Sequence, residues 1–472
     1  MTVTTIDPST GQPLDTYEET TPEQLDALLD DARSAYQGWG DLSPDQRAKG
    51  LGRLAEELRR REEELAMLAT LEMGKPLLES RAEVEKCAWT CEWYAEHGPK
   101  FLEAEVFETE ALRSQVVPQP LGVVFAIMPW NFPYWQVVRA LAPALAAGNV
   151  ILLKHAPSTT GCGLALANVA VSAGLPSAVL SVLVVSAERT AEASATVIED
   201  DRVAAVTLTG STRAGKSVAA VAGGALKKTV MELGGSDPFV VLADADLDAA
   251  AAWAVRSRFQ NTGQSCIAAK RIVVEEAVAD VFVGKMLDQV RDLRLGPPTE
   301  PEVTVGPLAR EDLRDAVERQ VRESVAQGAR ILAGGRVPSG PGFFYEPTVL
   351  DHVRPGMPVL QEEVFGPAVP VLRARDSAEA LQLANDSNYG LGSAVWTADL
   401  ERGEAFALSI EAGHTAVNGM TVSDPRLPFG GVKDSGYGRE LSHHGLFEFV
   451  DFHTVVVNAA DGPRADRRTA SE

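Results

Sequence analysis

The chain is poor in cysteine and in aromatic residues, and it contains no long hydrophobic run. Only four of its 472 residues are cysteines, and Phe, Trp and Tyr together make up 6%. No apolar stretch reaches the ~20 residues that a membrane-spanning helix needs, and no secretory signal opens the chain. We therefore expect a cytoplasmic protein without membrane contact, whose cysteines stay unpaired in a reducing compartment.

Basic residues are also scarce relative to acidic ones. The sequence has 43 Lys and Arg against 66 Asp and Glu, which gives a formal net charge of −23. Such a surface repels the phosphates of nucleic acids and of anionic lipids, so neither is an expected partner. A small anionic substrate remains compatible, because local cations can outweigh the global field. The length predicts at least two domains.

The order of the elements predicts an α/β fold. Helices are expected to begin at Pro22 and at Pro44, helical spacing continues over 47–72, and a further helix follows the break at 74–76. Strands and helices then alternate, which predicts a parallel sheet with strands at 123–127, 149–154, 181–185, 203–208 and 228–232. A second series has strands at 239–242, 271–274, 344–350, 369–373, 392–396 and 415–418.

Two segments fit neither series. Residues 105–117 and 449–459 alternate in β-forming residues, and strands left over from complete α/β units often pair with another subunit. We assign them to oligomerisation, as a homodimer or a homotetramer. The remaining units are 1–104 with 118–233 and then 234–448, and 460–472 is expected to be a frayed tail.

Cys266 is the strongest candidate for a reactive group. It ends the run Phe-Gln-Asn-Thr-Gly-Gln-Ser-Cys at 259–266, where small and amide residues leave room for a reactant. The thiolate is the nucleophilic form, so a reactive cysteine needs such polar surroundings. A core cysteine beside a glycine turn is the alternative. Cys87 and Cys91 are spaced as on one helix face, and no metal site is predicted.

Three other motifs carry possible chemistry. No Gly-x-Gly-x-x-Gly follows a strand, but Gly210-Ser211-Thr212 lies between a strand and a helix, where it either binds a pyrophosphate or merely caps the helix. Glu232 ends a buried strand, where a raised pKa would suit a general base. Asn131 follows another strand and either donates to an oxyanion or stabilises a turn.

Six motifs, in this order, resemble those of the aldehyde dehydrogenase superfamily. They are Pro-Trp-Asn-Phe-Pro at 129–133, Gly-Ser-Thr at 210–212, Glu-Leu-Gly-Gly at 232–235, Gly-Gln-Ser-Cys at 263–266, Glu-Val-Phe-Gly-Pro at 363–367 and Pro-Phe-Gly-Gly at 428–431. The resemblance spans about 6–458. It implies two doubly wound α/β domains, a Rossmann-like cofactor domain (1–104 and 118–233) and a catalytic domain (234–448), with a β extension for oligomerisation.

The resemblance also implies roles for single residues. Cys266 would attack the aldehyde carbon, Asn131 would stabilise the alkoxide, and Glu232 would activate the water that releases the acid. Coenzyme-A-acylating relatives generally lack that glutamate. The residues implied for NADP or NAD are Trp130, Lys154, Gly210, Ser211, Leu233, Glu363 and Phe365. Pro157 replaces the glutamate common in NAD-dependent relatives, which permits both cofactors and slightly favours NADP.

The details are similar to those of bacterial NAD(P)-dependent succinate-semialdehyde dehydrogenases. Arg139 would bind the far carboxylate of the substrate, or it is a solvated helix residue. Trp135 and Ser423 are the other residues implied for the substrate, and Arg426, close to Ser423 in the sequence, would replace the charge that is missing at position 260. Gln260 and Asp424 depart from that pattern, since some of these enzymes carry an arginine at the first position and a serine near the second.

Three alternatives stay open. One is another small-molecule aldehyde, such as glutarate semialdehyde or an aliphatic aldehyde. A papain-like thiol hydrolase would need a histidine base in a matching motif, which none of His352, His414, His443 and His444 provides. A non-catalytic relative would not need Cys266, Glu232 and Asn131 together.

Overall fold

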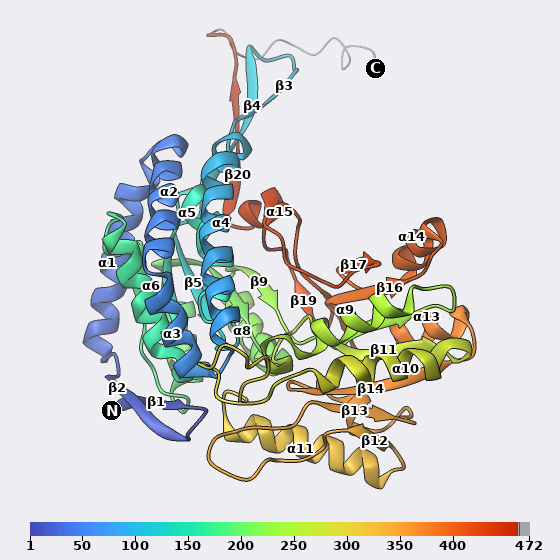
Figure 1. Ribbon diagram of the computed structural model, residues 1–472. Coiled ribbons are helices and arrows are strands. Elements are labelled where there is room, and N and C mark those ends of the chain that lie inside the picture. The colour runs from blue at the N-terminus through green and yellow to red at the C-terminus, as the bar shows by residue number, and fades with distance from the viewer. Residues whose placement is uncertain (461, 463–472) are drawn as a thin grey trace, which may run out of the picture.

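Two large sheets, each packed against helices, make up most of the molecule, and a small third sheet projects from one end (Figure 1). The structure is a computed structural model, and it describes residues 1–460 and 462. The predicted α/β class, with two sheet-centred domains and a β extension, is confirmed. The chain starts with an antiparallel hairpin of β1 (Thr2–Asp7) and β2 (Gln12–Glu18).

The first helices begin where the sequence predicts. α1 (Pro22–Gly40) and α2 (Pro44–Arg60) each follow a capping box, in which Thr21 or Ser43 accepts the backbone N–H three residues on. The helical spacing predicted for 47–72 is divided at Arg61 between α2 and α3 (Glu62–Met73). Gly74, with φ of 83°, then ends α3 in the left-handed conformation before α4 (Leu77–Phe101).

The first large sheet contains all five strands predicted for its region. Its order is β19-β9-β8-β5-β6-β7, and all neighbours are parallel except β19 with β9. The strands are β5 (Val123–Met128), β6 (Val150–His155), β7 (Leu180–Val182), β8 (Val203–Thr209), β9 (Lys228–Glu232) and β19 (Gly436–Tyr437). The helical segments among them are α5 (Trp135–Ala147), η1 (Pro157–Thr159), α6 (Thr160–Ser172), α7 (Thr190–Glu199) and α8 (Thr212–Gly224). Through β19, the C-terminal part of the chain extends this sheet.

The second large sheet has the order β12-β13-β14-β11-β10-β16-β17. Its strands are β10 (Asp237–Val241), β11 (Ala269–Glu275), β12 (Arg330–Ala333), β13 (Thr348–Asp351), β14 (Ala368–Ala374), β16 (Gly392–Trp396) and β17 (His414–Val417). Its helices are α9 (Leu247–Phe259), α10 (Glu276–Arg291), α11 (Glu311–Ala326), α12 (Pro358–Gln361), α13 (Ser377–Asn385) and α14 (Leu400–Ser409). The strand predicted at 344–350 begins only at Thr348, because Pro347 has no N–H for a ladder. The edge strand β12 was not predicted.

The remaining elements are short or lie in the projecting sheet. β15 (Tyr389–Gly390) pairs with β18 (Val432–Lys433), and α15 (Ser442–Phe447) follows. The projecting sheet has the order β20-β4-β3, with β3 (Glu105–Phe107), β4 (Arg113–Pro120) and β20 (Val450–Val457). The segment 105–117, predicted as one strand, thus contains β3 and the first part of β4. Most of the predicted tail lies outside the described residues. Every helix within the described part is too short or too polar to cross a bilayer.

Candidate active site

The loop that carries Cys266 has an unusual backbone. It joins α9 to β11 through the turn η2 (Gln260–Gly263), in which Asn261 and Thr262 have φ of 54° and 56°. Residues other than glycine rarely adopt this conformation. The side-chain amide of Asn261 compensates by donating to the carbonyl oxygen of Gln264 at 3.0 Å. Cys266 is partly exposed at the end of this loop, whereas Cys87, Cys91 and Cys162 are buried.

Lys270 fixes the same loop from the start of β11. Its Nζ donates to the carbonyl oxygens of Ser265 and Cys266 at 2.7 and 2.6 Å, and it forms an ion pair with Glu363 at 3.2 Å. Burial raises the pKa of the Cys266 thiol to about 12, and the cations Arg139 and Lys270 oppose that shift. The resting thiol is therefore protonated.

Asn131 is held against the cysteine loop. It is buried after β5, and its Nδ2 donates to the carbonyl oxygen of Gln264 at 3.0 Å. Asn261 in turn donates to the carbonyl oxygen of Asn131 at 2.8 Å. These bonds bring the predicted oxyanion donor to the segment that precedes Cys266.

Glu232 lies at the end of β9 with its side chain fully enclosed. Among the described residues, neither of its carboxyl oxygens has a hydrogen-bond partner. Burial, and next the nearby carboxyl group of Glu440, raises the pKa of Glu232 well above its usual range. Glu440 is itself ion-paired with Arg139. A protonated carboxyl group in this position becomes a competent base only after it loses its proton.

The Glu232 segment also touches the cysteine loop directly. A Cβ atom added to Gly235 would lie 2.5 Å from the carbonyl oxygen of Cys266. Only glycine therefore allows the two segments to approach this closely. The structure thus brings Cys266, Asn131 and the strand end of Glu232 to one region from three separate parts of the chain.

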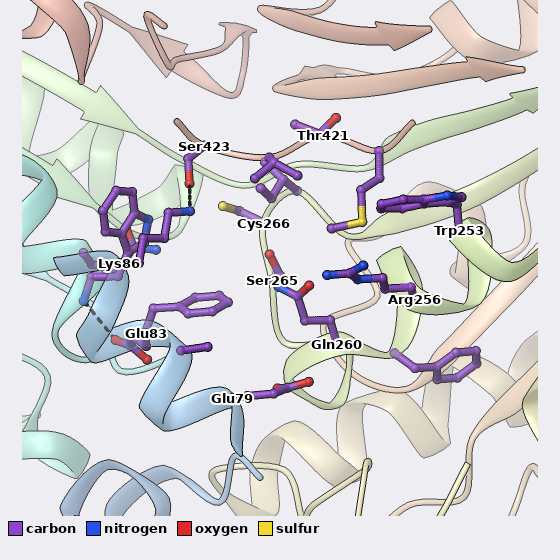
Figure 2. Close-up of a pocket in the computed structure, with 18 of the residues that line it drawn as sticks. Glu79, Glu83, Lys86, Trp253, Arg256, Gln260, Ser265, Cys266, Thr421 and Ser423 are labelled. Atoms are coloured by element: carbon purple, nitrogen blue, oxygen red, sulfur yellow. Dashed lines mark hydrogen bonds between the residues drawn. The ribbon is translucent and has the colours of Figure 1, made fainter. Parts of the chain in front are cut away.

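Cys266 opens onto a cavity of about 510 Å³ (Figure 2). Three of the residues predicted for the substrate, Trp135, Arg139 and Ser423, line the same cavity. Asn131 and Glu232 are not among its lining residues. Arg426 lies outside it, with an exposed side chain that forms an ion pair with Asp424 at 2.6 Å. Lining residues that were not predicted include Glu79, Lys86, Arg256 and Gln260.

The residues predicted for the cofactor surround the carboxyl ends of β6, β8 and β9. Ser211 caps α8 by accepting the N–H of Ala214 at 3.3 Å, as the capping alternative requires, and this leaves the other N–H groups of that helix end available. The backbone N–H of Gly210 donates a hydrogen bond to the carbonyl oxygen of Glu232 at 2.9 Å. A Cβ on Gly215 would lie 2.4 Å from Leu233, so Leu233 packs directly against α8.

A buried cation and an aromatic pair complete this region. Lys154 is the penultimate residue of β6, and burial lowers the pKa of its ammonium to about 8. Trp130 and Phe365 meet edge to face with ring centroids 5.7 Å apart. Glu363 accepts the N–H of Gly235 at 3.1 Å. A helix end with free donors, a buried ammonium and a fixed carboxylate form a donor and acceptor set that suits a pyrophosphate and two riboses.

The sequence model of the aldehyde dehydrogenase family matches residues 1–455. The chain belongs to the aldehyde dehydrogenase family. It is similar to the NAD(P)+ succinate semialdehyde dehydrogenase Sad of Escherichia coli (strain K12), with 46% identity over 450 residues, 95% of this chain and 96% of the relative. It is also 46% identical to the NADP(+) succinate-semialdehyde dehydrogenase 1 of Mycobacterium tuberculosis (strain H37Rv), over 97% and 100% of the two chains.

A solved aldehyde dehydrogenase structure has the same fold. The succinic semialdehyde dehydrogenase of Streptococcus pyogenes, solved in complex with NADP+, superimposes with a TM-score of 0.93 at 35% identity, over 97% of this chain and 100% of the other. The predicted family and the predicted class of enzyme, an aldehyde-oxidising dehydrogenase, are therefore confirmed.

Sequence reasoning missed three charged residues of the site. Lys270 begins a buried strand four residues after Cys266, a position at which a lysine needs partners, and this was a usable signal. Glu440 lies beyond the last of the six motifs, and no role was predicted for it. Lys86 lies on a predicted helix, and no local pattern distinguishes it from a solvated lysine.

Proposed function

We propose that this protein oxidises succinate semialdehyde to succinate, with NADP or NAD as the hydride acceptor. The observation that carries the proposal is that Cys266 shares one cavity with the cations Arg139 and Lys86 and with Ser423. A substrate with an aldehyde at one end and a carboxylate at the other matches this arrangement. The names of the two relatives with 46% identity support the same substrate.

The first chemical step falls to Cys266. Its Sγ loses a proton and attacks the aldehyde carbon, and the side-chain amide of Asn131 donates to the developing alkoxide. Lys270 and Arg139 favour the thiolate electrostatically. A nicotinamide held by the cofactor residues would supply the acceptor for the hydride of the tetrahedral carbon, which would leave a thioester on Cys266.

Glu232 acts in the second half of the reaction. It takes a proton from a water molecule, whose oxygen adds to the thioester carbon, and the C–S bond then breaks to release the acid and the thiolate. In sum, aldehyde, water and oxidised cofactor give carboxylate, reduced cofactor and two protons. Because Glu232 is buried with a raised pKa, this step becomes faster as the pH rises.

For the cofactor, we assign Trp130, Lys154, Gly210, Ser211, Leu233, Glu363 and Phe365 as the binding residues. Pro157 opens η1, two residues after the end of β6, and places no negative charge beside a ribose. This supports acceptance of the 2′-phosphate of NADP together with acceptance of NAD, with NADP slightly favoured. The names of the two relatives with 46% identity include both cofactors.

For the assembly, we assign a homodimer or a homotetramer formed through the projecting sheet. Its strands β3 and β20 are edges, and they expose Val106, Phe107, Phe452 and Val456. Exposed apolar strands of this kind are typical of surfaces that pair with another chain. Sedimentation of the full chain and of a Phe107→Glu/Phe452→Glu variant tests this, and a wild-type monomer would reject it.

The substrate is tested by steady-state formation of reduced cofactor from succinate semialdehyde, glutarate semialdehyde and butanal. Butanal is matched to succinate semialdehyde in chain length but has no carboxylate. We expect kcat/KM for succinate semialdehyde to exceed that for butanal by about 100-fold or more, the effect of one charge-assisted interaction. Equal values for these two would identify a general aldehyde dehydrogenase, and equal values for both semialdehydes a broader semialdehyde dehydrogenase.

A further inference from the structure

Lys86 is a half-buried lysine on the face of α4 that lines the cavity. Its Nζ donates to Ser423 Oγ at 2.8 Å and lies 4.2 Å from the ring centroid of Trp135. Figure 2 shows Lys86 and Ser423 together on the side of the cavity toward which the sulfur of Cys266 points. A cation therefore lies beside the place where the substrate chain must run from the reacting carbon.

This cation lacks a counter-charge. Within the described part of the chain Lys86 forms no ion pair, because its two acidic neighbours are engaged elsewhere. Glu83 is ion-paired with the buried Lys75 and accepts the N–H groups of Tyr134 and Trp135 at 2.8 and 2.9 Å. Asp424 is ion-paired with Arg426.

The other two cations of the cavity each have either a carboxylate partner or contact with solvent. Arg139 is ion-paired with Glu440 and donates to Thr209 Oγ1 at 3.2 Å. Arg256 is exposed to solvent, and Figure 2 places it near Gln260 and Trp253, away from Lys86. A partly desolvated, unpaired ammonium gains more from an incoming carboxylate than a paired guanidinium or a solvated one does.

We infer that Lys86, oriented by Ser423, is the principal cation that binds the remote carboxylate of the substrate. This rests on the proposed oxidation of a carboxylate-bearing aldehyde at Cys266. The ammonium has three donors, of which one is used by Ser423, so two remain for the carboxylate oxygens. Trp135 limits the directions in which the side chain can extend. Arg139 adds positive potential but keeps Glu440 as its partner.

Activation of Cys266 does not account for Lys86. The cations that oppose the burial-raised pKa of the Cys266 thiol are Arg139 and then Lys270. Lys86 is thus left with a role in recognition rather than in ionising the nucleophile.

The first test compares Lys86→Met with Lys100→Met. The first change keeps the length of the side chain and removes the charge, and the second does the same at an exposed position on the last turn of the same helix. For Lys86→Met we expect kcat/KM with succinate semialdehyde to fall about 10- to 100-fold, through KM, with butanal nearly unchanged. Unchanged butanal turnover also shows that the variant is folded. Lys100→Met should match the wild type with both aldehydes.

Two results would overturn the assignment. One is a Lys86→Met variant that keeps the wild-type preference for succinate semialdehyde over butanal. The other is loss of that preference in Arg139→Met or Arg256→Met while Lys86→Met retains it. If the wild type itself has no preference, the proposed substrate fails instead, so the two failures are distinguishable.

A second test uses pH and needs no variant. Burial, and then the charge of Arg139, lowers the pKa of Lys86 to about 8, while Cys87, Asp424 and Glu83 oppose the shift. The ammonium is charged below that pH and neutral above it. The ratio of kcat/KM for succinate semialdehyde to that for butanal should therefore fall as the pH rises through about 8. The titration of groups that act on both aldehydes changes both kcat/KM values equally and cancels in the ratio. A flat ratio between pH 7 and about 9.5 would reject Lys86 as the principal cation.

Discussion

Lys270 bonds the carbonyl oxygen of Cys266 at 2.6 Å, and the same ammonium forms an ion pair with Glu363 at 3.2 Å. One buried charge therefore joins the loop of the nucleophile to the carboxylate assigned to the cofactor. The Lys270 ammonium also donates to the carbonyl oxygen of Ser265. Its three acceptors are therefore two backbone carbonyl oxygens and the Glu363 carboxylate. The position of Cys266 thus depends on a residue that does not line the cavity.

Replacing Lys270 by Met should reduce both stability and turnover. The change leaves the carboxylate of Glu363 partly buried without its cation, which costs about 3 kcal/mol of unfolding free energy. It also releases the Cys266 loop, so kcat should fall about 100-fold. Urea denaturation and steady-state kinetics measure the two effects.

Lys285→Met is the matched control, because Lys285 pairs with Asp248 at the surface. The control should change the unfolding free energy by less than about 0.5 kcal/mol. If Lys270→Met behaved like this control in both measurements, Lys270 would have no part in holding the loop.

Alkylation of Cys266 should show a steep dependence on pH. The pKa of its thiol is raised to about 12, so the thiolate fraction of the free enzyme grows about tenfold per pH unit over the neutral range. Inactivation by iodoacetamide should accelerate accordingly between pH 7 and about 9. Peptide mass spectrometry should find the label on Cys266 alone, since the other three cysteines are buried. A rate that levels off below pH 8 would contradict this.

Elements with a strong local pattern were predictable from the sequence, and long-range pairings were not. The buried strands β5, β6 and β8 are mostly apolar and lie between turns, so their existence follows from composition. Gly74 ended a helix as expected, because a left-handed C-cap favours glycine. β12 begins with the exposed Arg330 at a sheet edge, and this pattern does not distinguish a strand from a loop.

The same division holds in the site. Cys266, Trp135, Arg139 and Ser423 were found through motifs, and the fold brings them to one cavity. Lys86 was missed because its partner Ser423 is 337 positions away, and only the folded chain shows that this lysine lacks a carboxylate. Arg426 was proposed as a substitute charge on proximity in sequence, but Asp424, two residues before it, pairs with it instead.

Glu232→Gln should separate the two halves of the reaction. The amide cannot take a proton from water, so the thioester on Cys266 should accumulate after one hydride transfer. We expect a burst of about one equivalent of reduced cofactor per active site, followed by steady turnover reduced about 100-fold or more. Rapid-mixing absorbance measures both phases. Steady turnover at the wild-type rate would reject Glu232 as the base.

Pro157→Glu should change the choice of cofactor. Pro157 lies two residues after the end of β6, and Lys154, one of the residues assigned to the cofactor, lies three residues before it. A carboxylate at position 157 would repel a 2′-phosphate and accept a bond from the 2′-hydroxyl of NAD. We expect kcat/KM for NADP to fall about tenfold or more, while that for NAD is kept or rises. Pro157→Gln is the control, because it removes the ring without adding charge, and it should leave the ratio between the cofactors nearly unchanged. A similar loss of kcat/KM for NADP in both variants would show that the effect comes from backbone geometry. No loss in Pro157→Glu would show that the adenosine ribose binds elsewhere.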